Sequence, residues 1–129
     1  MYSKINTKKV ITKHGKNIAE SLGLSRWSIK YHVYKSGAKE LKDLKVRFSN
    51  HTGNSGVSFI GDNKADIILF YDNLDSESQA VDILFHEHLH LFFYNLLRCV
   101  TIKEDEASRL EEKMVRRLET LYYKTLRRK

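Results

Sequence analysis

Five consecutive residues, His86-Glu87-His88-Leu89-His90, limit the possible folds of this chain because they interrupt a long stretch of apolar residues. On a helix, His86 and His90 lie four positions apart and project from the same face. Two imidazoles placed in this way can hold one Zn²⁺, and a glutamate beside the first histidine can act as a general base. Histidine and glutamate are costly to bury without partners. The motif therefore predicts a metal site on a largely buried helix, with hydrolysis as its chemistry.

Charge is unevenly distributed along the 129 residues, 41% of which are hydrophobic, enough for one domain with a core. Residues 1–47 contain 12 Lys and Arg against 3 Asp and Glu, residues 48–101 contain 2 against 7, and residues 102–129 contain 9 against 6. The basic ends fit a solvated surface, and they equally fit attraction to nucleic acid or to an acidic partner. The acidic middle, which contains the motif, suits a cation.

Three features bear on where the protein is expected to act. No apolar run approaches the roughly 20 residues that a membrane span needs. The segment from Met1 to Lys16 is basic and polar, without the apolar region of a secretory signal. Cys99 is the only cysteine, so no internal disulfide can form. We expect a cytoplasmic protein without a membrane partner, and the sequence carries no signal of its oligomeric state.

The periodicity of apolar residues predicts an α+β fold. The N-terminal segment, residues 1–37, is expected to be helical, because apolar side chains follow helical spacing from Lys16 to Ser36, with a break near Gly23. A small three-stranded sheet is expected from three later segments: Leu44 to Phe48, Val57 to Ile60 and Ala65 to Tyr71.

Two further helices are expected after these strands. The first is capped by Asp75 or Ser76 and carries the motif to about Arg98. The second runs from about Lys103 to Lys124. Its buried stripe is expected to consist of Ala107, Leu110, Met114, Leu118 and Leu121.

A zinc site needs a third protein ligand. After His90 the chain contains no histidine, so a downstream ligand must be Cys99 or a carboxylate. This points to a site of two histidines and one acid. The acidic candidates in the last helix are Glu104, Asp105, Glu106, Glu111 and Glu112.

The short linker after Cys99 predicts that the last helix folds back antiparallel, which brings its first turn toward the motif. Glu104 is favoured as the third ligand, because the small residues Ala107 and Ser108 lie on its face and allow close approach. Glu106 is the alternative, since the helical spacing does not separate the two. His88 lies about 200° around the helix from either motif histidine and cannot join the same metal.

These motifs resemble those of minimal zincins of the gluzincin type, in particular the ImmA/IrrE-like and small phage-encoded metallopeptidases. The resemblance covers about Leu41 to Leu121. The run ADIILFYDNLDSESQAVDILFHEHLH corresponds to the strand, loop and active-site helix of this family. The run EDEASRLEE resembles the E-x-x-A-N-x-F-A segment of the third-ligand helix, with Ser108 in place of Asn.

The resemblance implies a zinc metallopeptidase whose zincin-like core spans residues 38–129 and whose substrate is a protein or a peptide. It implies that His86, His90 and Glu104 hold Zn²⁺. Glu87 would take a proton from water and give it to the leaving amine. The substrate would lie along an edge strand, expected here around Asp66 to Phe70. An oxyanion-stabilising side chain is often present in such sites, and the candidates are Tyr94, Tyr122 and Tyr123.

The N-terminal run GKNIAESLGLSRWSIKYHV resembles a helix-turn-helix, with Ala19, Gly23 and Ile29 at its expected positions. The resemblance implies that a second helix, Arg26 to Tyr34, enters the major groove of DNA. Its candidate contacts are Arg26, Ser28, Lys30 and Lys35. An alternative function is therefore a DNA-binding regulator with an inactive or structural zincin-like domain, and the possible partners include DNA or a DNA-bound regulator. The competing interpretation of the same segment is a helix that covers the sheet.

Overall fold

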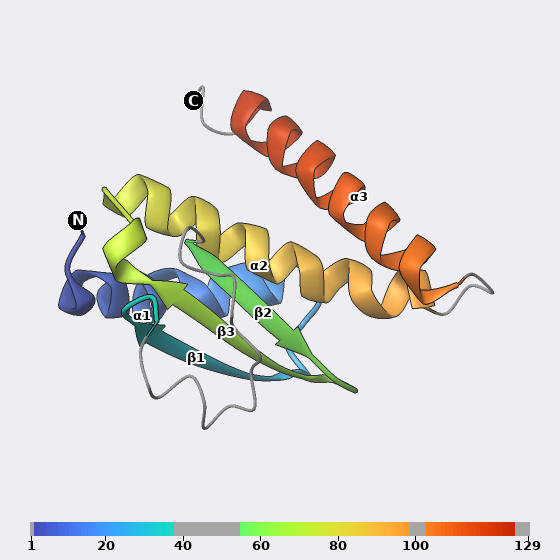
Figure 1. The fold of residues 1–129 in the computed structure, drawn as a ribbon, viewed down its shortest axis with the longest axis horizontal. Coiled ribbons are helices and arrows are strands. Elements are labelled where there is room, and N and C mark those ends of the chain that lie inside the picture. Colours follow the sequence, from blue (N-terminus) through green and yellow to red (C-terminus); the bar gives the residue numbers. More distant parts are fainter. Residues whose placement is uncertain (1, 38–54, 99–102, 126–129) are drawn as a thin grey trace.

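The computed structural model describes residues 2–37, 55–98 and 103–125, which form an α+β fold (Figure 1). This confirms the predicted class. In chain order the elements are α1 (Lys4–Ser21), β1 (Ser28–Tyr34), β2 (Gly56–Ile60), β3 (Lys64–Phe70), the 3-10 turn η2 (Tyr71–Asn73), α2 (Glu77–Arg98) and α3 (Glu104–Thr125). Within these residues, no helix is both long and apolar enough to cross a membrane.

The described sheet has three strands in the order β1-β3-β2, with β1 parallel and β2 antiparallel to β3. The residues of β3 from Ala65 to Phe70 form an almost unbroken apolar run, because the side chains on both faces of this strand are buried. Helices α1 and α2 pack against one face of the sheet, and α3 packs against α2 (Figure 1). Helix α2 is thus enclosed between the sheet and α3.

Two clusters of buried side chains explain why α2 is apolar on more than one face. Leu84 and Leu91 face the sheet, in a cluster with Ile67 and Leu69 of β3. Other apolar residues of α2 meet α3 in a second cluster, whose buried members are Leu89, Phe93, Leu97, Ala107 and Val115. A fully buried Leu contributes about 1.5–3 kcal/mol through removal from water. This burial on two sides fixes the motif-bearing helix in place.

Ser76 is the residue that caps α2. Its hydroxyl oxygen accepts a hydrogen bond from the Gln79 backbone N–H at 3.1 Å, and the Gln79 side-chain oxygen accepts one from the Asp75 N–H at 2.6 Å. Side-chain oxygens thereby satisfy backbone donors that the first turn of a helix leaves unpaired.

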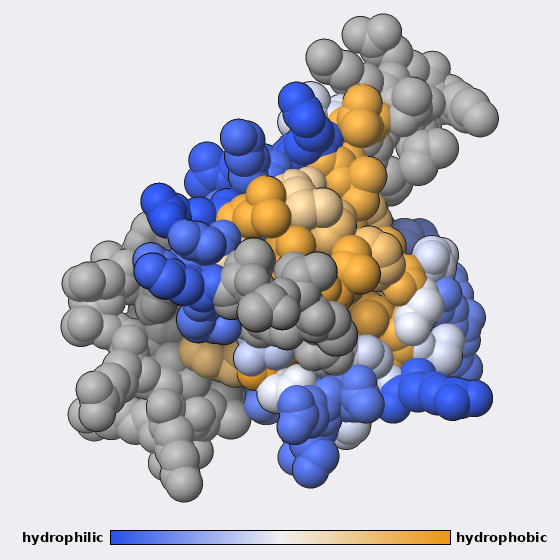
Figure 2. All heavy atoms as spheres, turned by 90° about the vertical axis from the view of Figure 1, so that its right-hand side faces the viewer, coloured by the Kyte–Doolittle hydropathy of each residue, from blue (hydrophilic) through white to orange (hydrophobic). Residues whose placement is uncertain are grey.

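The buried face of α3 differs from the predicted apolar stripe. Ala107 is buried as expected, but Leu110 and Leu121 are 41% and 52% exposed, while Val115 and Glu111 are 0% and 6% exposed. The buried face is therefore turned around the helix axis relative to the stripe. A band of apolar side chains consequently reaches the surface, as Figure 2 shows.

The predicted helix from Lys16 to Ser36 is wrong in its second half. Helix α1 begins earlier, at Lys4, and ends at Ser21, and Gly23 then adopts a φ of +73° that favours glycine. The segment Ser28–Tyr34 is strand β1. The helix-turn-helix interpretation required a helix here, so it is wrong as well.

The error has a physical cause in the spacing of the apolar residues of β1. Ile29 and Val33 are four positions apart, and residues with this spacing share a face on a helix and also on a strand. The residue between them, Tyr31, decides the matter, because it packs with Ile29 against the core as a period of two requires. The strand predicted from Leu44 to Phe48 lies outside the described residues.

Gly56 in β2 lies so close to α2 that alanine there should destabilise the fold. A Cβ at Gly56 would approach the Ile83 side chain to 2.7 Å and the Ile68 carbonyl oxygen to 3.3 Å. We expect Gly56→Ala to lower the free energy of unfolding by about 1–3 kcal/mol through overpacking, measured by denaturant titration. Gly61→Ala is the matched control, since its Cβ would meet its nearest atom only at 3.9 Å. Equal effects of the two substitutions would show that the close approach is not maintained in solution.

Candidate metal centre

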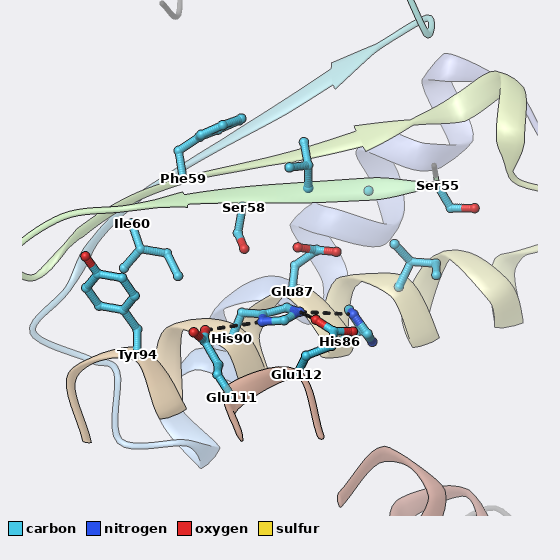
Figure 3. Close-up of a pocket in the computed structure, with 13 residues that line it drawn as sticks. Ser55, Ser58, Phe59, Ile60, His86, Glu87, His90, Tyr94, Glu111 and Glu112 are labelled. Atoms are coloured by element: carbon cyan, nitrogen blue, oxygen red, sulfur yellow. Dashed lines mark hydrogen bonds and ion pairs between the residues drawn. The ribbon is translucent and has the colours of Figure 1, made fainter. Parts of the chain in front are cut away.

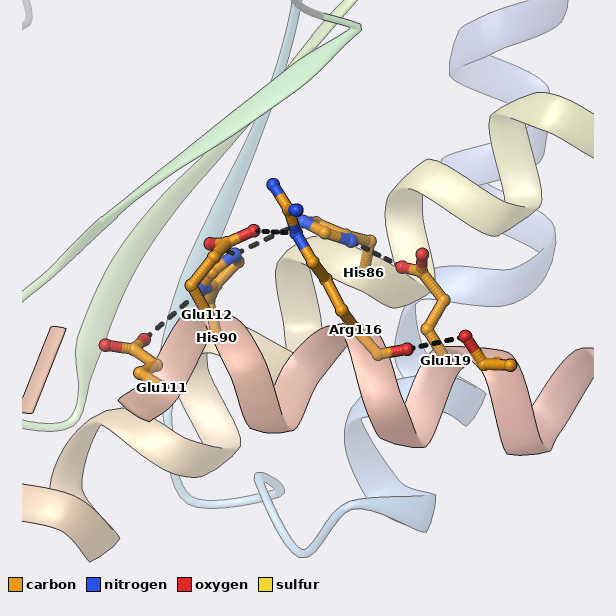
Figure 4. A network of polar contacts seen from close by, with 7 residues as sticks. His86, His90, Glu111, Glu112, Arg116 and Glu119 are labelled. Atoms are coloured by element: carbon orange, nitrogen blue, oxygen red, sulfur yellow. Dashed lines mark hydrogen bonds and ion pairs between the residues drawn. The ribbon is translucent and has the colours of Figure 1, made fainter. Parts of the chain in front are cut away.

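Three side chains from two helices converge on one point in the part of the chain that the structure describes. His86 and His90 project from α2 with their Nε2 atoms 3.2 Å apart, and a Glu112 oxygen from α3 lies 3.2 Å from His90 Nε2 (Figure 4). One ligand atom from each residue lies within 4.8 Å of the other two. This is a group of two imidazoles and one carboxylate, the composition that the sequence predicts.

The other ring nitrogen of each histidine is held by a second carboxylate. His90 Nδ1 lies 3.2 Å from Glu111 Oε1, and His86 Nδ1 hydrogen-bonds to Glu119 Oε2 (Figure 4). An ionised carboxylate only accepts, so each Nδ1 donates its proton, and each Nε2 of a neutral ring carries a lone pair. Such partners orient metal-binding histidines in known sites.

This arrangement of donors fits a metal cation. Two lone pairs 3.2 Å apart, with a carboxylate oxygen beside them, repel one another unless a proton or a cation lies between them. Burial acts to lower the pKa of His90, but the hydrogen bond to Glu111 and the negative charges of Glu87 and Glu112 outweigh it, so the pKa is raised. The same negative charges would favour a bound divalent cation.

Glu112, and not Glu104, is the acid that completes this group. Glu104 and the alternative Glu106 are exposed in the first turn of α3 and do not belong to the group. Glu104 lies eight residues before Glu112, or about 12 Å along the helix axis at 1.5 Å per residue. The assignment of Glu104 is therefore corrected to Glu112, while the fold-back of α3 onto α2 is as expected.

The position of Glu112 follows from how the two helices are joined. His90 lies eight residues before Arg98, the end of α2, and Glu112 lies eight residues after Glu104, the start of α3. In an antiparallel pair of helices joined by a short connection, residues equally far from the connection face each other. Counting from the connection places Glu111 and Glu112 opposite His90, whereas a search for small neighbouring residues favours Glu104.

A groove of about 620 Å³ opens beside the histidines, bounded by β2, α2 and α3 (Figure 3). Its lining includes Ser58 and Ile60 from β2, Glu87 and Tyr94 from α2, and Glu111 and Glu112 from α3. The prediction that a substrate pairs with the strand around Asp66 to Phe70 is wrong, because this strand, β3, is already paired on both sides. The strand beside the groove is β2. Tyr94 is the tyrosine that reaches the groove, and the side chains of Tyr122 and Tyr123 lie outside the described part.

Glu87 points from α2 toward β2 and is 5% exposed (Figure 3). Burial raises the pKa of its carboxyl group, against the opposing effects of His86, His90 and a hydrogen bond with Ser58. A carboxyl group with a raised pKa beside a groove is a candidate for proton transfer. The general-base role expected for Glu87 stays a prediction.

His88 is buried, and both of its ring nitrogens have hydrogen-bond partners within the protein. Its Nδ1 donates to the Leu84 carbonyl oxygen at 2.7 Å, and its Nε2 lies 2.8 Å from the Tyr31 hydroxyl. Burial raises the pKa of Tyr31 to about 12, so the hydroxyl keeps its proton and donates it to His88. Both nitrogens of His88 thus have partners, Nδ1 within α2 and Nε2 in β1, which agrees with its exclusion from the metal ligands.

Removing the outer carboxylate on His86 should weaken metal binding without removing a ligand. Glu119→Gln leaves a side chain of similar shape that holds the imidazole less firmly. We expect about a 10–100-fold loss of zinc affinity, measured by competition with a coloured chelator. Glu106→Gln, which removes one negative charge from the exposed start of the same helix, should change the affinity little. A loss of equal size in both variants would show that only net charge matters.

The chain was also compared with models of known protein families, with curated proteins and with solved structures, and none of the three comparisons found a match.

Proposed function

We propose that the chain is a zinc-dependent metallopeptidase with a zincin-like fold, which hydrolyses peptide bonds of a protein or peptide substrate. The observation that carries this proposal is the convergence of His86, His90 and Glu112 in a groove that also contains the buried carboxyl group of Glu87. The resemblance of the motif to those of minimal zincins supports it.

The donor set suits zinc. Catalytic zinc sites commonly use three protein ligands of the His and Glu type and keep one position open for water or substrate. Nδ1 of His86 and of His90 each have a carboxylate partner, which leaves Nε2 as the ligand atom. When bound, Zn²⁺ would act as a Lewis acid on the substrate carbonyl and lower the pKa of a water molecule.

Glu87 would then carry the proton. Its carboxylate would accept a proton from the water molecule as the water oxygen attacks the substrate carbonyl carbon. It would then deliver this proton to the leaving amine. The Ser58 hydroxyl, which hydrogen-bonds to Glu87, would keep the carboxylate turned toward the groove. Burial of Glu87 makes these interactions stronger than they would be in water.

A peptide substrate is favoured by the strand that forms one wall of the groove. Strand β2 lies at an edge of the described sheet, and its residues from Gly56 to Ile60 all line the groove. An edge strand offers backbone N–H and C=O groups to an extended peptide. A peptide paired with β2 would pass directly over Ser58 and Glu87.

The proposal is tested on the purified full chain by metal analysis and by hydrolysis of a peptide library. We expect one zinc per chain, loss of hydrolysis when a chelator removes the zinc, and recovery when zinc is added back. His90→Ala should lose both zinc and hydrolysis. Hydrolysis that persists in His90→Ala, or a purified chain that does not bind zinc, would refute the proposal.

A further inference from the structure

Four lysines form a basic face on α1: Lys8, Lys9, Lys13 and Lys16, all exposed. They occupy eight residue steps, or about 12 Å of helix at 1.5 Å per residue. The side of α1 that faces away from these lysines is buried in the core through Thr7 and Val10. The basic face is therefore turned toward solvent by the packing of the helix.

The positive charges of this face are poorly neutralised. Lys9 and Lys13 are four positions apart and Lys16 follows three later, and like charges at such spacings oppose helix formation by about 0.2–0.5 kcal/mol per pair. Among the described residues, the only ion pair of these lysines joins Lys13 Nζ to Glu77 at 3.9 Å, with side chains 69% and 57% exposed. A pair so exposed contributes little. Glu20 is the single acidic residue of α1.

A shallow hollow of about 210 Å³ lies at the C-terminal end of the basic face. Lys16, Glu20, Ser25 and Trp27 are among its lining residues. Trp27 is half-buried, and it is the only tryptophan of the chain. The structure thus places an aromatic ring next to the last lysine of a basic row.

We propose that the basic face of α1 and Trp27 together form a binding site for single-stranded nucleic acid. The lysines contact the phosphate backbone, and one unstacked base lies against the ring of Trp27. Lysine–phosphate contacts combined with base stacking on an aromatic side chain provide binding with little dependence on base sequence. A duplex offers the phosphates but keeps its bases stacked, so it uses the lysines alone.

A membrane surface fits this face less well than a nucleic acid does. Helices that lie in a membrane interface insert an apolar face. In α1, Val10 and Ala19 are buried in the core and Ile11 and Ile18 pack against it, so Ile5 is the exposed large apolar residue that remains. Binding to this helix is therefore electrostatic, with Trp27 as its aromatic contact.

This site is separate from the groove of the candidate metal centre. Helix α1 packs on α2 and β1, whereas the groove is lined by β2, α2 and α3 (Figure 1). A nucleic acid on the basic face would leave the groove accessible. The inference does not rest on the proposed peptidase function, and it is tested on protein without added metal.

The test uses a fluorescein-labelled oligothymidine and compares two triple variants that lose equal charge. One variant carries Lys9→Gln, Lys13→Gln and Lys16→Gln, and the control carries Lys103→Gln, Lys113→Gln and Arg117→Gln at exposed positions. We expect the first variant to bind at least about tenfold more weakly than wild type. The magnitude of the slope of log K against log salt should fall by about 2, because each of the three lost phosphate contacts contributes about 0.7 for a single strand. The control should keep most of the affinity, and bound oligothymidine should quench Trp27 fluorescence in wild type and control.

Circular dichroism checks that both variants keep their fold, as expected for exposed side chains. Equal losses of affinity in the two variants would overturn the proposal, because net charge alone would then explain binding. Tighter binding to a duplex, or no change of Trp27 fluorescence on binding, would overturn the contact with a base. Binding to anionic phosphatidylserine vesicles but not to oligothymidine would show that the face binds membranes instead.

Discussion

Glu112→Gln should reduce the zinc affinity of the chain by at least about 100-fold, more than the 10–100-fold typical for loss of an outer partner of a ligand. Glu112 is the acid whose oxygen lies 3.2 Å from His90 Nε2, so the substitution removes its negative charge and replaces one carboxylate oxygen by an amide nitrogen that cannot bind the metal. Glutamine keeps the shape of the side chain but binds divalent cations more weakly. Isothermal titration of metal-free protein in the presence of a competing chelator measures the change.

Glu104→Gln is the matched control for this experiment. It removes the same charge from the same helix, eight residues from Glu112 and in its exposed first turn. We expect its zinc affinity to remain within about threefold of wild type, as for a solvated charge at some distance. A larger loss in Glu104→Gln than in Glu112→Gln would mean that α3 pairs with α2 in another register in solution.

Arg116, on the same helix, orients the side chain of Glu112. Its Oε1 accepts a hydrogen bond from Arg116 Nε at 3.1 Å, while its Oε2 faces His90 (Figure 4). The spacing of four residues places Arg116 one turn further along α3. One carboxylate oxygen is thereby occupied and the other is directed at the histidines, which is why a change at this position should be large.

Glu87→Gln should lower peptide hydrolysis by about 10²–10⁴-fold, the usual contribution of a general acid–base group. The amide cannot accept the proton from water, while His86, His90 and Glu112 are untouched. Zinc content should remain at one per chain. Initial rates on a fluorogenic peptide, together with metal analysis of the same sample, measure both quantities.

The folding of Glu87→Gln provides the necessary control. Burial raises the pKa of Glu87, so the site disfavours the charged form, and a neutral amide of equal shape should not lower the melting temperature. A variant that loses hydrolysis while keeping its zinc and its melting temperature assigns a catalytic role to the side chain. A variant that keeps full hydrolysis would remove Glu87 from the mechanism.

Elements with a long periodic pattern could be predicted because the pattern itself is local. In α2, apolar residues recur over six turns and a capping group precedes them, so its start at Glu77 and its end at Arg98 were close to expectation. Strand β3 is an almost continuous apolar run of the length typical for a buried strand. Strand β1 was mistaken for helix because Ile29 and Val33 satisfy both periodicities.

The buried face of α3 shows a different limit of sequence patterns. The apolar stripe from Leu110 to Leu121 predicts the side that packs, yet Glu111 is buried and Leu110 is partly exposed. A polar residue can be buried when it finds a charged or hydrogen-bonding partner, and His90 is that partner. Apolar periodicity does not contain this information, because the partner lies on another helix.

The sequence by itself was enough to predict the two histidines, the adjacent glutamate and a third ligand that is an acid or Cys99, since all of these follow from spacing within one helix and from the residue types that remain downstream. Only the tertiary structure decided which acid this is. The choice depends on how α3 is aligned and rotated against α2, and many contacts set these two quantities together, including those of Ala107 and Val115 with the apolar side of α2. A shift of α3 by about two turns would bring Glu104 or Glu119 to the place of Glu112 at almost no cost in helical propensity, so the packing between the helices makes the selection.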